Sequence, residues 1–144
     1  MIRHTQNVAE TEQVAMDLAA QLRGGECICL SGELGAGKTQ FVRGLLRGLG
    51  GSGRSVSSPT FVILNIYDSG RLSLFHIDAY RLGNHEDAGA FDIAELLQNR
   101  GVVVIEWPER IAAQIPPGCL WICITATGES SRCIEIRQPA EPAR

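Results

Sequence analysis

The chain has 144 residues, of which 44% are hydrophobic and 20% are charged, as in an ordinary folded domain that needs neither disulfides nor metals to hold its core. Its net charge of −3 argues against a protein that grips nucleic acid by itself, because such binding depends on a basic surface. No apolar run approaches the roughly 20 residues of a membrane span, and the first residues lack the apolar region of a secretory signal. We therefore expect a cytoplasmic protein that contacts no membrane, folded as a single domain over residues 1–144 with a flexible tail at 138–144.

The first 30 residues predict a helix followed by a buried strand. Asn7 and Glu10 have the spacing of a capping box, and apolar residues recur at helical intervals after them. These signals predict a helix over residues 8–22, which Gly24 and Gly25 then terminate. Residues 27–30 are a short apolar run, which is typical of a buried strand.

A glycine-rich loop follows this strand directly. Residues 32–39 match the phosphate-binding pattern Gly-x4-Gly-Lys-[Ser/Thr] without a break, and Lys38 is the only lysine in a chain with twelve arginines. An ammonium can lie along a β/γ-phosphate bridge in a way that the planar guanidinium group does not reproduce. The apolar spacing through Leu49 predicts that a helix follows the loop, so its N-terminal amides would bind phosphates and the Thr39 hydroxyl would bind Mg²⁺.

The second half of the chain predicts mainly strands. A short turn containing Gly70 separates two apolar runs, which predicts a β-hairpin, and the continuous β-branched run at 102–105 is typical of a strand covered on both faces. Residues 50–58 are rich in glycine and serine and are expected to form a surface loop. The predicted elements are strands at 61–67 and 72–77, a helix at 86–99, a strand at 102–105, a short helix at 108–115, and two strands at 120–125 and 133–137 that pair with each other.

This order of elements predicts an α/β fold. We expect a P-loop NTPase-like three-layer sandwich with a mainly parallel central sheet plus antiparallel hairpins.

Two acidic residues end predicted strands and are candidates for the metal site. Asp78 follows an apolar run that contains His76, and Glu106 follows the run at 102–105. A nucleoside triphosphate site needs a carboxylate near the metal, and the carboxyl ends of strands beside the loop supply one. One acid would hold Mg²⁺ or its water shell while the other orients the attacking water, and either assignment is compatible with the sequence. His76 is a ligand, a base or a packed core residue, and Trp107 either stacks on a nucleotide or fills the core.

Two further features have both a functional and a structural interpretation. Residues 57–60 are either a switch that responds to the γ-phosphate or a turn that leads into a strand. The five cysteines include no paired C-x2-C arrangement. We interpret Cys27 and Cys29 as small buried hydrophobic side chains rather than as redox or metal ligands.

The joint pattern of motifs resembles the bacterial TsaE (YjeE) family over roughly residues 5–137. The motifs that carry this resemblance are residues 32–39, 58–61, 76–82 and 105–109. The resemblance implies an ATPase of the machinery that makes N6-threonylcarbamoyladenosine (t6A) at position 37 of tRNAs. It also implies TsaD and TsaB as protein partners, with contact to tRNA only through that complex and with TsaC supplying the threonylcarbamoyl-adenylate donor.

The resemblance also implies roles for individual residues, with ATP or ADP and Mg²⁺ as the ligands. Thr39 and Glu106 would serve Mg²⁺, and Asp78 would be the Walker B-like acid. The residues that would bind the phosphates are Leu34, Gly35, Ala36, Gly37, Lys38 and Thr39.

Three positions outside these motif cores are implied in the same way. Thr60 would be the switch residue, and Thr11 and Arg132 would contact the nucleotide. Ala79 stands where the family often has leucine, a difference at a non-polar position that affects no chemistry.

A phosphate cradle without a second substrate motif suits a protein that transmits hydrolysis to a partner, so we expect ATP turnover to drive or reset the TsaD–TsaB complex. One alternative is a small-molecule kinase, although residues 80–90 contain only one arginine for a lid. A GTPase is disfavoured because the chain has no Asn-Lys-x-Asp signature. A third possibility is a module that senses ATP without hydrolysing it.

Overall fold

The computed structural model describes residues 1–53, 64–80 and 92–138. One seven-stranded sheet has the order β1-β7-β6-β2-β5-β4-β3. The elements, in chain order, are β1 (Ile2–Thr5), α1 (Val8–Ala19), β2 (Cys27–Ser31), α2 (Lys38–Gly48), β3 (Leu64–Tyr67), β4 (Leu74–Asp78), α3 (Ile93–Gln98), β5 (Val102–Glu106), the 3₁₀ helix η3 (Pro108–Gln114), β6 (Leu120–Ala126) and β7 (Arg132–Arg137).

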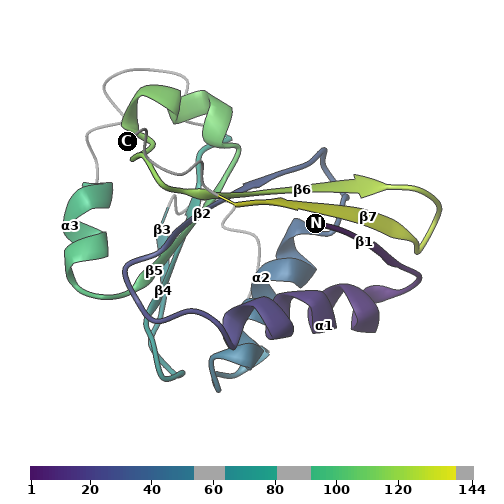
Figure 1. Cartoon of the computed structure of the whole chain (residues 1–144), viewed down its shortest axis with the longest axis horizontal. Coiled ribbons are helices and arrows are strands. Elements are labelled where there is room, and N and C mark those ends of the chain that lie inside the picture. Colours follow the sequence, from purple (N-terminus) through teal and green to yellow (C-terminus); the bar gives the residue numbers. More distant parts are fainter. Residues whose placement is uncertain (54–63, 81–91, 139–144) are drawn as a thin grey trace.

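The sheet is the middle of three layers. Helices α1 and α2 lie on one face, whereas α3 and η3 lie on the other (Figure 1). Two separate apolar clusters fill the two interfaces, one containing the buried residues of α1 and α2 and the other containing Ile93 of α3 and Ile111 of η3. The predicted three-layer α/β fold is confirmed.

The centre of the sheet is parallel and its edges are antiparallel. Strand β2 pairs in parallel with β5 and β6, and β5 pairs in parallel with β4. The pairs β3–β4, β6–β7 and β1–β7 are antiparallel. The predicted pairing of the two late strands is therefore confirmed, as is the predicted hairpin over its described residues.

The burial of β5 and β6 explains their different sequence patterns. All five residues of β5 are buried, because helices cover both faces of the sheet there. Burial alternates along β6, where Ile122 and Ile124 point into the core and Trp121 is 42% exposed. The sheet is therefore covered on one face only at β6.

Helix α1 begins at the predicted capping box and ends earlier than predicted. The Asn7 side chain accepts a hydrogen bond from the Glu10 amide, and the Glu10 carboxylate accepts one from the Gln6 amide. The predicted end at residue 22 is wrong by three residues, because the chain tightens after Ala19 into i→i+3 hydrogen bonds that lead to Gly24, whose φ is +102°.

Helices α1 and α2 approach each other closely because α2 carries small residues at the contact. A Cβ added at Gly44 would lie 2.8 Å from the Cβ of Ala15, and nearer still to the Glu12 carbonyl oxygen. The Glu12 carboxylate is also bonded to the guanidinium groups of Arg43 and Arg47. This pair of helices fixes the orientation of the α2 N-terminus, where the glycine-rich loop ends.

Strand β1 was not predicted. Its first three residues are exposed, so no apolar pattern marks it, and it forms only by pairing with β7. Helix α3 occupies 93–98 of the predicted 86–99 and is capped by Asp92, and residues 86–91 lie outside the described part of the chain. The same holds for the loop at 54–58, the strand start at 61–63 and, except for Gln138, the predicted tail.

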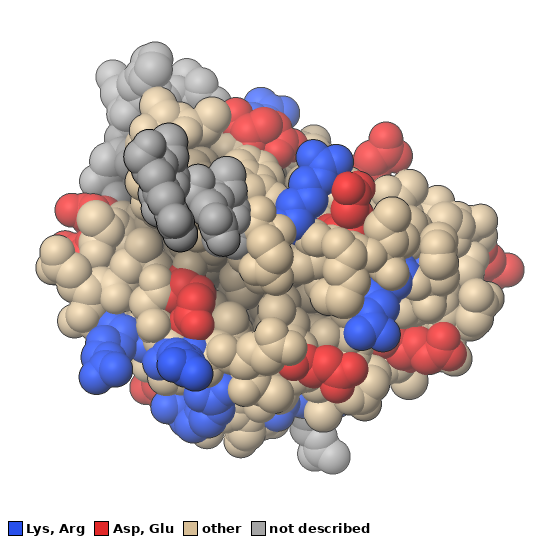
Figure 2. Space-filling model, in the orientation of Figure 1, with Lys and Arg blue, Asp and Glu red and all other residues tan. Residues whose placement is uncertain are grey.

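The surface charge and the lengths of the helices can be compared with the expectations from composition. On the face shown in Figure 2, basic side chains gather at the lower left, and acidic side chains are spread over the rest of the face. Within the described ranges, no helix combines the length and the hydropathy required to span a bilayer.

Candidate nucleotide site

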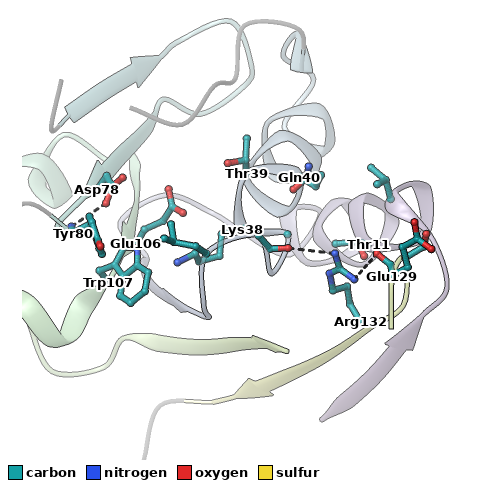
Figure 3. A pocket seen from close by; sticks show the side chains of 15 residues that line it. Thr11, Lys38, Thr39, Gln40, Asp78, Tyr80, Glu106, Trp107, Glu129 and Arg132 are labelled. Carbon is teal, nitrogen blue, oxygen red and sulfur yellow. Dashed lines mark hydrogen bonds between the residues drawn. The ribbon is translucent and has the colours of Figure 1, made fainter. Parts of the chain in front are cut away.

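A cavity of about 590 Å³ opens at the carboxyl ends of β2, β4 and β5, within the size range of small-molecule sites. Figure 3 shows one group of lining residues, here called the acidic end, which consists of Asp78, Tyr80, Glu106 and Trp107. A second group, here called the arginine end, consists of Thr11, Glu129 and Arg132. The Lys38 side chain reaches the acidic end, where its ammonium lies beside Trp107.

The glycine-rich loop connects β2 to α2 and lines this cavity. Gly37 is the N-cap of α2 with a φ of +109°, a left-handed conformation that a residue with a side chain adopts only under strain. No side chain caps the first turn of α2, so its N-terminal amides are available to an anion. Leu34, Gly35, Lys38 and Thr39 line the cavity, while Ala36 is buried beneath the loop.

The Lys38 ammonium is buried and held by groups of the site itself. Its Nζ donates a hydrogen bond of 2.6 Å to the Gly32 carbonyl and lies 3.8 Å from the centroid of the Trp107 ring. Burial lowers the pKa of Lys38 below its ordinary value, and the carboxylates of Glu106 and Asp78 act in the opposite direction. Among the described residues, the buried ammonium forms no ion pair, and a phosphate group at this position would supply an anionic partner.

The two strand-end acids lie side by side. Asp78 and Glu106 are register partners on the parallel strands β4 and β5, and both line the cavity. Glu106 is buried, and its Oε2 lies 2.5 Å from Nε2 of the fully buried His76. Burial raises the pKa of Asp78, whereas the hydrogen bond that its carboxylate accepts from the Tyr80 amide lowers it.

Comparisons with known proteins identify the family of this chain. The family model of the threonylcarbamoyl adenosine biosynthesis protein TsaE matches residues 5–134. The chain belongs to the TsaE family. The resemblance found in the sequence is thereby confirmed, and the P-loop fold of this family implies nucleotide binding.

Individual relatives agree with this assignment. The tRNA threonylcarbamoyladenosine biosynthesis protein TsaE of Bacillus subtilis is 40% identical over 129 residues, which are 89% of this chain and 79% of the relative. The TsaE protein of Treponema pallidum is 41% identical over 115 residues, which cover 80% and 84% of the two chains. The crystal structure of Bacillus subtilis YdiB superimposes with a TM-score of 0.80 at 32% identity, covering 97% of this chain and 86% of that one.

Thr11 and Arg132, the two residues outside the motif cores with an implied nucleotide contact, lie at the arginine end. Arg132 donates hydrogen bonds to the carbonyls of Ala36 and Gly35, at 2.8 and 3.3 Å, so it ties the turn before β7 to the glycine-rich loop. Thr11 is buried, and its hydroxyl is 2.8 Å from that of Thr5. Thr60, the implied switch residue, lies outside the described residues.

The side chains present suit a magnesium ion. Thr39 offers a hydroxyl, and Asp78 and Glu106 offer carboxylates, all lining one cavity. These are hard oxygen donors, which Mg²⁺ prefers together with phosphate oxygens and water. The donor set therefore fits the metal expected from the sequence.

Trp107 contributes to the site with an unusual backbone conformation. Its φ of 57° is left-handed, which is rare for a bulky residue and concentrated at functional sites. Its ring lies 5.0 Å from that of Tyr80, centroid to centroid, and receives Lys38. Trp107 thus lines the cavity and also packs, partly buried, against the apolar cluster of the α3 face.

Sequence reasoning did not identify several lining residues. Tyr80 follows Asp78 closely, and its place in the motif at 76–82 was the available signal. Gln40 extends the loop motif by one residue on α2, whereas Glu129 and Ser130 belong to the turn between β6 and β7 and carry no recognisable sequence signal.

Three cysteines meet on the opposite face of the sheet. The sulfurs of Cys27, Cys29 and Cys119 all lie within 4.8 Å of one another. Cys27 and Cys29 are buried as predicted, among the apolar residues of the α3 face. Cys119 donates a hydrogen bond to the Pro116 carbonyl, and its approach to the other two was not predicted.

Proposed function

We propose that this TsaE-family protein is a Mg²⁺-dependent ATP hydrolase that serves t6A modification of tRNA at adenosine 37. The observation that carries the proposal is the convergence of one buried ammonium, two carboxylates and the amides of a helix N-terminus on a single cavity. Relatives at 40 and 41% identity are named for threonylcarbamoyladenosine biosynthesis, which supports the pathway.

The positions of the charges orient the nucleotide. Lys38 and Thr39 adjoin the acidic end, so the γ-phosphate and the metal would lie there and the nucleoside would extend toward Thr11 at the arginine end. Thr39, Asp78 and Glu106 would hold Mg²⁺, which would supply positive charge against the charge that develops during phosphoryl transfer.

Different residues of the cavity would have different roles in hydrolysis. Lys38 would leave the Gly32 carbonyl to bind the β- and γ-phosphates, and the amides of Gly35 to Thr39 would cradle them. Asp78 and Glu106 would share metal binding and orientation of a water molecule, whose oxygen attacks the γ-phosphorus as the bond to ADP breaks. The products are ADP and inorganic phosphate.

The net charge of the chain indicates which partner would hold the tRNA. A chain of net charge −3 is poorly suited to bind tRNA directly. Protein partners, TsaD and TsaB, would hold the tRNA, and ATP turnover would drive or reset their complex in the cytoplasm.

The test is phosphate release from ATP by the chain alone, with TsaD and TsaB, and with candidate acceptor hydroxyl compounds. Glu106→Gln keeps the shape of the side chain and removes its charge, so we expect ADP affinity within a few-fold of the parent and turnover lowered by about 100-fold. Unchanged turnover would exclude Glu106 from the reaction, and ADP formation that requires an acceptor would identify a kinase. A chain that binds ATP and never releases phosphate, even with both partners, would be a sensor.

Partner binding needs a separate measurement. We expect the chain to co-purify with TsaD and TsaB when ATP is present. Failure to associate with or without ATP would contradict the pathway assignment while leaving the nucleotide site intact.

A further inference from the structure

Behind the acidic end of the cavity lies a histidine that touches neither the cavity nor solvent. His76 is on β4, two residues before Asp78 and therefore on the same face of the strand, and its side chain is fully buried. Its Nε2 is 2.5 Å from Oε2 of Glu106 on the neighbouring strand. The ring thus reaches the site only through the Glu106 carboxylate.

The direction of this hydrogen bond follows from the chemistry of its partners. An ionised carboxylate only accepts hydrogen bonds, so Nε2 of His76 must carry the proton and donate it. The other ring nitrogen, Nδ1, is buried and has no hydrogen-bond partner in the described part of the chain. Among the described residues, the ring therefore has a single polar contact, and that contact is with Glu106.

The bond fixes the orientation of the Glu106 carboxylate. The terminal torsion of a glutamate is broad, so an unsupported carboxylate samples many orientations. Holding Oε2 leaves Oε1 as the oxygen available to the cavity that Glu106 lines. Partners of this kind commonly set the orientation and basicity of a group at a metal site, and their loss reduces metal affinity or activity by about 10- to 100-fold.

We propose that His76 is a positioning residue, which holds one oxygen of Glu106 through an Nε2–H hydrogen bond and leaves the other oxygen directed to the nucleotide and its metal. The proposal deepens the proposed function and its kinetic consequences rest on it. The hydrogen bond itself is a property of the protein without nucleotide, so it is testable separately.

The first measurement concerns the bond alone. Imidazole ¹⁵N NMR of the nucleotide-free protein distinguishes a ring protonated at Nε2 from one protonated only at Nδ1. We expect the His76 Nε2–H signal to be protected from exchange and to shift in Glu106→Ala. A ring that carries its proton only on Nδ1 overturns the proposal, whether or not the protein hydrolyses ATP.

The second measurement compares two substitutions of similar length. The amide of His76→Gln reaches the position of Nε2 and can donate to Glu106, whereas His76→Met fills similar space without a donor. We expect His76→Met to lower kcat for ATP hydrolysis by about 10- to 100-fold. Its affinity for ADP in the absence of metal should stay within twofold of the parent. We expect kcat of His76→Gln to lie within about threefold of the parent value. Equal kcat in the two variants overturns the proposal.

A neighbouring residue provides the control. Tyr67 lies beside His76 on the adjacent strand, with 6.4 Å between ring centroids, and its hydroxyl has no partner in the described part of the chain. Tyr67→Phe changes the same buried region without touching Glu106, so we expect unchanged kcat. A loss of kcat in Tyr67→Phe equal to that in His76→Met would point to general packing and overturn the specific role of His76.

Discussion

Strands β2, β5 and β4 are neighbours in the sheet, and their two faces carry different kinds of side chain. On the face toward α1 and α2, β4 and β5 run through apolar residues and then end in Asp78 and Glu106, with His76 behind them. On the face toward α3 and η3, the buried residues of β2, β4 and β5 are apolar or thiol side chains, namely Cys27, Cys29, Phe75, Ile77, Val103 and Ile105. The charged groups of the cavity thus come from the α2 face, at the last residues of β4 and β5, with His76 two residues earlier.

This difference shows how the fold separates stability from function. The α3 face consists of groups that gain free energy when buried. The α2 face, at its carboxyl end, buries an ammonium and carboxylates that lose hydration. Substitutions on the two faces should therefore have opposite effects on folding and on nucleotide binding.

The largest effect is expected from the apolar face. Phe75→Ala removes a buried aromatic ring from the α3 face, which should lower the free energy of unfolding by about 3–5 kcal/mol. ADP affinity of the remaining folded protein should be unchanged, measured by titration well below the unfolding midpoint. Loss of affinity without loss of stability would contradict the separation of the two faces.

Substitution of Lys38 should weaken nucleotide binding without lowering stability. Lys38→Ala should weaken ADP binding by about 10- to 100-fold, because a charged hydrogen bond contributes about 1.5–3 kcal/mol. Since burial lowers the pKa of Lys38, its charge is a cost to the nucleotide-free protein, and urea unfolding should show no loss of stability. Equal affinity of both proteins in equilibrium dialysis would remove Lys38 from the site.

The packing of the two helices that support the loop should have an intermediate effect. Gly44→Ala places a methyl group against Ala15 and the Glu12 backbone, and such overpacking costs about 1–3 kcal/mol. Thermal unfolding measures the loss. Gly50→Ala is a control in which no atom lies within 4 Å of the new Cβ, although its φ of +85° adds backbone strain. A more stable Gly44→Ala would show that α1 and α2 can move apart.

The smallest effect is a pH dependence at Asp78. Burial raises the pKa of this carboxyl above its ordinary value of 3.8. Between 3.8 and the raised pKa, the folded state binds more protons than the unfolded state, so the contribution of Asp78 to stability falls as pH rises. Asp78→Asn should therefore be more stable than the parent near neutral pH, and the difference should shrink as pH is lowered toward 3.8. Parallel stability curves for the two proteins in urea would contradict this expectation.

The sequence predicted the elements that carry local signals. The loop at 32–39, the acids at the ends of β4 and β5, and the strand at 102–105 each have a motif or an apolar run, and the structure places them together. Strand β1 escaped prediction because its stability comes from pairing with β7, over a hundred residues away in the sequence.

The contacts within the site depend on register, which no local pattern encodes. The bond between His76 and Glu106 exists because β4 and β5 align Asp78 with Glu106. The reach of Arg132 to the Ala36 carbonyl depends in the same way on the turn that precedes β7.

The position of Lys38 over the Trp107 ring has a practical consequence. An ammonium against an indole alters its fluorescence, so departure of Lys38 toward a phosphate should change the emission of Trp107. The chain has two tryptophans, and Trp121 lies on the open face of β6, away from the cavity lining. In a Trp121→Phe background, the intrinsic emission becomes a label-free optical reporter of ligand occupancy.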